Sequence, residues 1–149
     1  MENLQWDKYA SLLHPSELQR FKDILMPGIQ KIIAKDTSDT INVLGKNFSA
    51  KEIQNEPSHQ FFVDMMNLVF GLSLELGNTF KGMVNKDVGA IADGDSLVYV
   101  VMKTKMKIGP RDVKEMNVFT LSKYNNEWKL NLSSKVEGIA MMVQQSLMR

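Results

Sequence analysis

Three side chains are the strongest candidates for acid–base chemistry: Asp64 on a predicted helix, and Asp87 and Tyr99 on predicted strands. A carboxyl group in an apolar cavity has its pKa raised by desolvation, so it can transfer a proton, and a tyrosine hydroxyl can stabilise an oxyanion. Each residue also has a structural interpretation. Asp64 fits a solvated helix edge, Tyr99 fits sheet packing, and a one-residue change of register would turn Asp87 to the other face. We therefore treat the catalytic residues as unknown.

The other common catalytic and cofactor-binding patterns are missing from the sequence. The two histidines, His14 and His59, are not spaced as a metal-ligand pair, so no metal site is predicted. The chain has no cysteine, hence no thiolate nucleophile and no disulfide. Neither a GxGxxG string nor a phosphate loop occurs, so no cofactor is predicted. Whether the protein is an enzyme is uncertain, and binding is the more expected role.

Several apolar side chains on the predicted strands could line a ligand pocket. The pocket residues we expect are Tyr99, Met102, Met116 and Trp128. Eleven methionines in the chain can serve either as adaptable binding surface or as ordinary core filling.

Positive charge is concentrated around the second predicted turn, in Lys103, Lys105, Lys107, Arg111 and Lys114. Such a run can contact phosphates, or it can protect an exposed strand end from aggregation. No aromatic residues alternate with these lysines to stack on bases, so nucleic acid is not an expected partner.

Length and composition indicate one ordinary globular domain. The chain has 149 residues, 23% of them charged, and a net charge of +1, which gives no strong field for nucleic acid or anionic membranes. No apolar run is long enough for a membrane helix, because the densest one, 61–76, is interrupted by polar residues. Residues 1–13 do not resemble a signal peptide. The compartment is unknown: cytoplasmic for the sequence as given, periplasmic or exported if a leader is removed.

The first half of the chain is predicted to be helical. A short helix is expected at Leu4–Leu13, and another from Pro15, which Pro27-Gly28 kinks or ends. Asp39 is expected to cap a short helix through Leu44, and Ser49 to begin a capping box. The segment 57–72 is apolar around most of its circumference. It must be buried among a sheet and other helices, against a second copy, or both.

The second half is predicted to be an antiparallel meander. Its strands are expected at 80–92, 96–108, 113–124 and 127–132, because the turn signals Asp93-Gly94, Gly109-Pro110 and Asn125-Asn126 separate them. In the second strand, Val98 to Ile108 form one apolar face by alternation, while Leu97, Tyr99 and Val101 face the other way and continue into lysines. Trp128 alternates inward and is expected in the core. A final helix, capped by Ser133 or Ser134, follows.

Three segments carry a resemblance: 12–18 (LLHPSEL), 94–101 (GDSLVYVV) and 126–132 (NEWKLNL). Helices followed by a curved meander resemble the cystatin-like cone of the nuclear transport factor two-like superfamily. That superfamily includes ketosteroid isomerase and scytalone dehydratase, and the local pattern resembles uncharacterised bacterial members. The resemblance implies a concave sheet face, closed by helices, that can hold a pocket. It also implies homodimerisation through the sheet or an apolar helix.

We therefore expect a single α+β domain over 1–149, with helices packed on a curved antiparallel sheet of about four strands. Residues 1–78 are expected to be mainly helical, 79–133 to form the sheet and 134–149 the C-terminal helix. The expected function is non-enzymatic binding of a small apolar ligand, or protein interaction, by a homodimer. The alternative is a cofactor-independent isomerase, dehydratase or hydrolase with an acid and a tyrosine in the pocket.

Overall fold

A computed structural model describes residues 5–149 and shows a mixed α+β chain. Contacts divide the described residues into two compact units, each treated by itself. The helical unit comprises Trp6–Leu68 and Leu132–Arg149, and the sheet unit comprises Gln5 and Val69–Asn131. The prediction of one folding domain is not tested by this division. Among the described residues, no helix has the length and hydropathy needed to cross a membrane.

The helical unit begins with α1 (Trp6–Leu12) and the long α2 (Pro15–Lys35). Leu4, where the first helix was expected to begin, lies outside the described residues. His14 caps α2, since its Nδ1 accepts a hydrogen bond of 3.2 Å from the backbone N–H of Ser16. The helix continues through Pro27 to Lys35, so Pro27-Gly28 does not end it.

The prediction of a helix between Asp39 and Leu44 is wrong. The segment is instead a β-hairpin, β1 (Thr40–Val43) with β2 (Lys46–Ser49), paired in antiparallel register. Ile41 and Val43 are β-branched and alternate, and the structure buries both completely. Leu44 and Gly45 turn the chain with positive φ angles of 51° and 88°. Leucine is rare in that conformation, so the usual asparagine–glycine signal is absent and Gly45 is the one turn-favouring residue of the pair.

Two further helices complete this part of the chain. Ser49 caps α3 (Ala50–Asn55) by accepting a hydrogen bond of 3.3 Å from the N–H of Glu52, as its capping-box position predicted. The apolar helix is α4 (Ser58–Leu72), and it is buried within the chain on most sides. Its Phe62 packs on Phe21 of α2 with ring centroids 4.7 Å apart in an edge-on arrangement.

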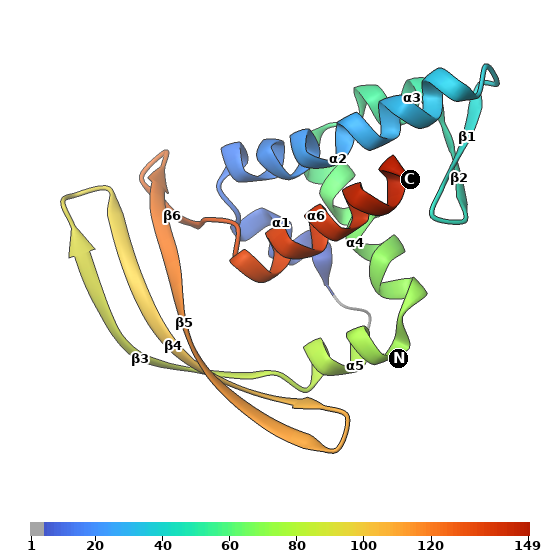
Figure 1. Cartoon of the computed structure of the whole chain (residues 1–149). Helices are drawn as coiled ribbons and strands as arrows, with labels where there is room; N and C mark the ends of the chain where they lie inside the picture. The colour runs from blue at the N-terminus through green and yellow to red at the C-terminus, as the bar shows by residue number, and fades with distance from the viewer. Residues whose placement is uncertain (1–4) are drawn as a thin grey trace. The chain divides into compact units, whose positions relative to one another are not determined.

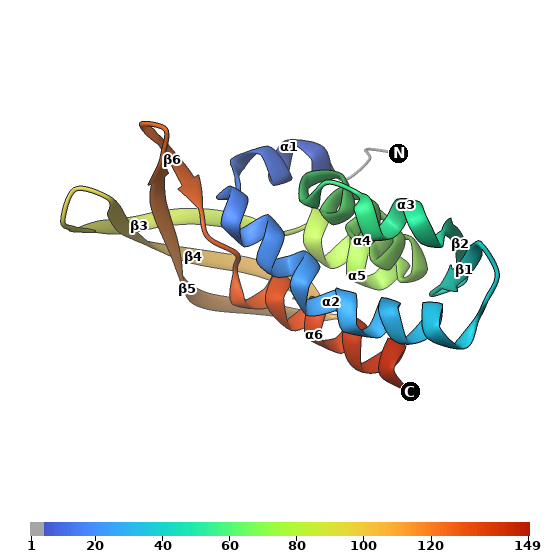
Figure 2. The same cartoon turned by 90° about the horizontal axis from the view of Figure 1, so that it is seen from above.

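The C-terminal helix α6 (Ser134–Met148) lies alongside α2, as two views show (Figures 1 and 2). Its cap is Ser133, and its buried stripe is the predicted one: Val136, Ile139, Ala140, Val143 and Leu147. The two helices pack closely together at Gly28. A Cβ atom there would lie 2.7 Å from Cβ of Leu147, so only glycine fits.

The sheet unit contains α5 (Leu74–Lys81) and a four-stranded antiparallel meander: β3 (Val84–Asp93), β4 (Leu97–Ile108), β5 (Arg111–Tyr124) and β6 (Glu127–Leu130). The predicted meander and its three turns are confirmed, with positive φ at Gly94, Gly109, Asn125 and Asn126. The sequence pattern did not predict α5, and the first strand was therefore expected to begin too early, within the end of that helix. Figure 1 shows β3, β4 and β5 as long curved strands.

Two features of the meander position its side chains. Twelve directly opposed pairs align β4 with β5, from Leu97 with Ser122 to Ile108 with Arg111. The ladder between β3 and β4 is interrupted by a bulge at Val88, between Asp87 and Gly89.

We expect Gly28→Ala to lower the free energy of unfolding by about 1–3 kcal/mol, because the added methyl group must push α6 away from α2. The matched control is Gly138→Ala on α6, where nothing lies within 4 Å of the added Cβ. That change should raise the free energy by about 0.5–1 kcal/mol through helix propensity. Urea denaturation of both variants measures these effects, and equal stabilisation by the two would contradict the close packing.

Candidate functional site

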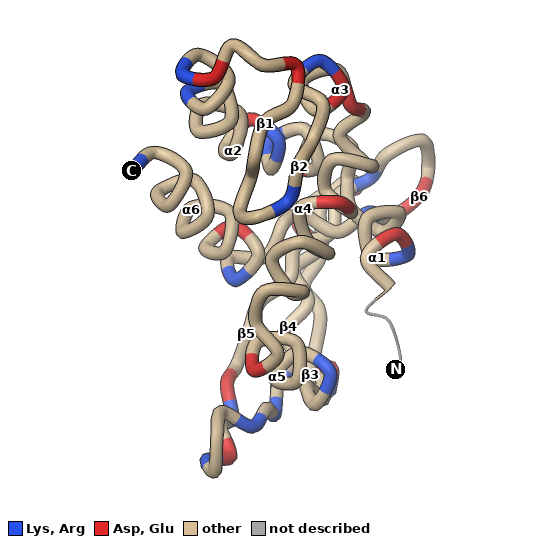
Figure 3. Tube along the Cα trace, turned by 90° about the vertical axis from the view of Figure 1, so that its right-hand side faces the viewer, with Lys and Arg blue, Asp and Glu red and all other residues tan. Residues whose placement is uncertain are grey.

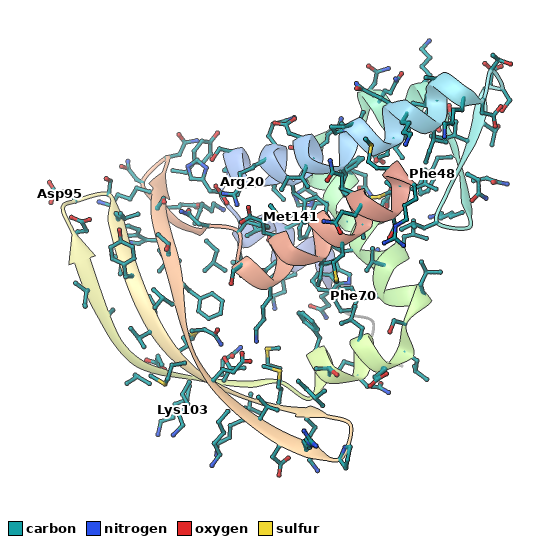
Figure 4. The ribbon with its side chains drawn as sticks, in the orientation of Figure 1. Arg20, Phe48, Phe70, Asp95, Lys103 and Met141 are labelled. Atoms are coloured by element: carbon teal, nitrogen blue, oxygen red, sulfur yellow. The ribbon has the colours of Figure 1, made fainter. Side chains whose placement is uncertain are left out.

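The alternation of β4 divides the sheet into two faces. We call the face with Leu97, Tyr99 and Val101 the convex face, because Figure 4 shows Lys103 of the same alternation projecting from the outer side of the curved sheet. The other is the concave face, with Val98, Val100 and Met102. Residues directly opposite in antiparallel strands share a face, so the register assigns each paired residue of β3 and β5 to one of the two faces.

The convex face is apolar in its middle and exposed there. Ile91 and Thr120 flank Tyr99, while Gly89 and Val118 flank Val101. Ile91 is 65% exposed, Val118 63% and Met116, one row further, 59%. Apolar side chains grouped in this way on a sheet face are typical of a surface that another molecule covers.

Lysines follow the apolar residues on the same face. Lys86 lies opposite Lys103, and Lys105 lies opposite Lys114, with Lys107 beyond them. Figure 3 shows lysine and arginine positions toward the turn between β4 and β5, with acidic positions among them. None of these five ammonium groups has an ion pair with a carboxylate among residues 5–149. The lysines that the sequence showed as a run therefore share one solvated face.

Acidic residues mark the opposite end of the convex face. Asp93 pairs with Leu97 on this face, and Asp95 lies in the turn between β3 and β4, where Figure 4 labels it at the hairpin tip. Along its length, the convex face thus carries acids, then apolar side chains, then lysines, with Asp112 opposite Lys107 at the far end.

The concave face holds a polar network around Thr104. This residue is 1% exposed. Its hydroxyl donates to Oδ1 of Asn85 at 2.7 Å and accepts from Nδ2 of Asn117 at 3.1 Å. The hydroxyl is satisfied within the sheet, so the network helps to hold β3, β4 and β5 against one another.

An open groove of about 1050 Å³ lies between α5 and the end of the β4–β5 hairpin. Leu74 and Asn78 line it from the helix, and Val84, Met106 and Val113 from the strands. The edge-on contact of Phe70 with Phe80, with centroids 4.8 Å apart, fixes α5 beside the end of α4. Most of the exposed lining area is apolar, but Lys105, Lys107 and Lys114 of the strands also line the groove, together with the carboxylates of Glu75 and Asp112.

The structure separates the residues predicted as sites. Asp87 lies opposite Met102 on the concave face, while Tyr99 is on the convex face, so no single surface of the sheet holds both. The predicted pocket set is divided in the same way. Met116 shares the convex face with Tyr99, whereas Trp128 shares the concave face with Met102. None of the four lines the groove.

The placement of Trp128 in the core is wrong. Its ring is 43% exposed at the end of the β5–β6 hairpin, and Nζ of Lys123 lies 5.3 Å above the ring centroid. Alternation directed the ring to the concave face as expected. Alternation assigns a side chain to a face but does not show whether that part of the face is covered.

Asp64 belongs to a cluster that the sequence did not reveal. It is half-buried, accepts a hydrogen bond of 3.0 Å from Gln60 and faces Glu56, which follows α3. Burial raises the pKa of Glu56 to about 7, and the hydrogen bond with Asp64 and the charge of Asp64 act in the same direction. The cations of Lys22 and Lys46 oppose the rise. Asp64 is therefore one partner of a carboxyl pair and not a freely solvated edge.

Lys22 of α2 completes this cluster. Its side chain is buried, and its ammonium donates to the backbone carbonyls of Gln54 at 3.0 Å and Glu56 at 2.5 Å. The same ammonium lies 5.5 Å from the ring centroid of Phe61. Lys22 thereby satisfies carbonyl groups at the end of α3 and joins α2, α3 and α4.

The two histidines have structural roles. His14 caps α2, as described above, and Nε2 of His59 lies 2.8 Å from Oδ1 of Asp7, joining α4 to α1. The ring of Tyr9 is half-buried, and burial raises the pKa of its hydroxyl while a hydrogen bond with Ser133 opposes the rise.

No protein-family model matches the chain, and no curated protein matches it significantly. The similarity to the nuclear transport factor two-like superfamily therefore stays an interpretation of the sequence pattern.

The stability of the protein should respond to the protonation of Glu56. Its pKa is about 7 in the folded chain against an ordinary value of 4.5, so the folded state holds the proton more tightly. The contribution to stability is complete below pH 4.5 and is lost as the pH rises to about 7. Glu56→Gln should therefore gain stability relative to the unchanged protein between pH 5 and pH 8.

This prediction is tested by measuring the urea midpoints of the unchanged protein and of Glu56→Gln at both ends of that pH range. Asp64→Asn is the matched variant, because it removes one cause of the raised pKa and should also weaken the pH dependence. Parallel pH profiles for the unchanged protein and Glu56→Gln would show that Glu56 titrates normally.

Proposed function

We propose that the protein is a non-enzymatic interaction domain that works as a homodimer through the convex face of its sheet. One observation carries the proposal: the exposed apolar side chains Ile91, Val118 and Met116 lie together on that face. Dimerisation is also what the resemblance to the nuclear transport factor two-like superfamily implies.

The burial of apolar area supplies the driving force. Fully covering an exposed side chain of this size contributes about 1.5–3 kcal/mol, of which association costs consume a large part. The side chains at the centre of the face are therefore the ones on which binding should depend. The lysines around them keep the face soluble before it is covered.

The geometry gives no support to the enzymatic alternative. A proton-transfer site of the expected kind needs an acid and a tyrosine in one pocket. Asp87 and Tyr99 lie on opposite faces. The groove beside α5 is lined by Glu75 and Asp112 but by neither histidine nor tyrosine.

Dimerisation is tested by light scattering and sedimentation at about 100 µM, where a micromolar dimer is essentially complete. We expect a dimer, and we expect Val118→Asp and Ile91→Asp to be folded monomers, because a carboxylate would be buried in the interface. Met142→Asp is the control: Met142 is equally exposed but lies on α6 in the other unit. A monomer at this concentration, or dissociation by Met142→Asp alone, would overturn the proposal.

The groove favours a second role, binding of a small apolar ligand. Its volume lies just above the usual range for ligand pockets, and most of its exposed lining area is apolar. A hydrophobic fluorescent dye such as anilinonaphthalene sulfonate should bind there, and Leu74→Asp should weaken the binding. Because the convex face can also bind the dye, Val118→Asp is measured in parallel. Loss of dye binding in that variant alone would exclude the groove.

A further inference from the structure

We infer that the two copies meet across a two-fold axis that runs across the strands, so that the acidic hairpin tip of one copy lies over the lysines of the other. This inference rests on the proposed homodimer and adds its orientation and the residues that set it. The acidic tip is Asp93 and Asp95, and the lysine pair is Lys86 and Lys103.

Symmetry restricts the choices. Two identical faces that cover each other are related by a two-fold axis lying in the plane between them. If that axis ran along the strands, each end of the face would meet the same end of the partner. Lysines would then face lysines and the acidic tips would face each other, which is repulsive at both ends.

An axis across the strands exchanges the two ends. Placed between the row of Tyr99 and the row of Val101, it sets these rows against each other and keeps the apolar middle covered. The row of Asp93 and Leu97 then lies over the row of Lys86 and Lys103. Asp95, in the adjoining turn, extends toward Lys105 of the next row.

This placement of the axis sets both charged rows at the same distance from it, measured along the strand. The rows of Leu97 and Lys103 are six residues apart on β4, which is about 20 Å at 3.3–3.4 Å per residue. The axis lies midway between them, so both charged rows lie about 10 Å from it, on opposite sides. Each dimer therefore contains the acid–lysine contact twice.

The charges are also available for pairing. Asp93, Asp95, Lys86 and Lys103 are all exposed, and none has an ion pair within residues 5–149. Their free ends can be satisfied by a partner without breaking a contact inside the chain. Exposed pairs of this kind contribute modestly to affinity but determine orientation and salt dependence.

The test reverses the charges one cluster at a time. In the Asp93→Lys/Asp95→Lys variant, and in the Lys86→Glu/Lys103→Glu variant, like charges would meet twice in each dimer. We expect each to raise the dimer Kd about tenfold or more at low salt. The variant with all four changes has the original net charge of +1 and should return to within about threefold of the original Kd.

A control separates orientation from total charge. Asp39→Lys/Glu52→Lys adds the same charge as reversal of the acidic tip, but on exposed residues of the helical unit. Its Kd should stay within about threefold of the unchanged protein. Sedimentation equilibrium measures all five proteins, and raising the salt should weaken only the dimers with complementary charges.

The outcomes distinguish this inference from the proposed function. A dimer that Val118→Asp dissociates, but that neither charge reversal weakens, keeps the surface and overturns the orientation. Weakening by both reversals without recovery in the four-residue variant also overturns it. A protein that is monomeric before any substitution removes the proposed function itself.

Discussion

The register between β4 and β5 is the constraint on which the surface of the sheet depends. Side chains alternate with a period of two, and twelve consecutive pairs hold the two strands in one alignment. A slip of one residue would turn Tyr99, Val101 and the lysines toward the Thr104 network. The buried hydrogen bonds of Thr104 to Asn85 and Asn117 would then be lost. The polar network on the concave face thus keeps the same set of side chains on the convex face.

The helical unit depends on a different kind of constraint, the close approach of α2 and α6. Gly28 leaves room for Leu147, and the ion pair of Arg20 with Glu137 joins the same two helices. The aromatic contact between Phe21 and Phe62 then brings α4 against α2. Lys22 and the pair of Glu56 and Asp64 lie at the periphery of this core, where burial is enough to shift a pKa but the lysine still has backbone partners.

The meander and the buried stripe of α6 could be predicted from sequence because both follow local rules. Turn residues such as Gly94 and Asn126 adopt positive φ at little cost, and the stripe from Val136 to Leu147 follows the helical period. The hairpin after Asp39 could not be found in this way, because Leu44 occupies a turn conformation that leucine rarely adopts. Its stability comes from burying Ile41 and Val43, which is a tertiary effect.

The candidate sites were less predictable than the elements. The faces of β4 follow from alternation, but whether a face is covered depends on distant segments. Trp128 is exposed for that reason despite its inward alternation. Glu56 meets Asp64 only because α3 ends where α4 begins its first turns. A residue between a short helix and a proline carries no sequence signal of such a pairing.

The outer strand β3 has a consequence for how copies of this chain can associate. All ten of its residues are exposed, so its free backbone groups could template a further strand. The bulge at Val88 interrupts the regular spacing of those groups, and the charges of Lys86 and Asp87 lie directly beside it. The bulge therefore obstructs the addition of further strands at the middle of β3. Such strand addition is the route by which sheets grow into fibrils.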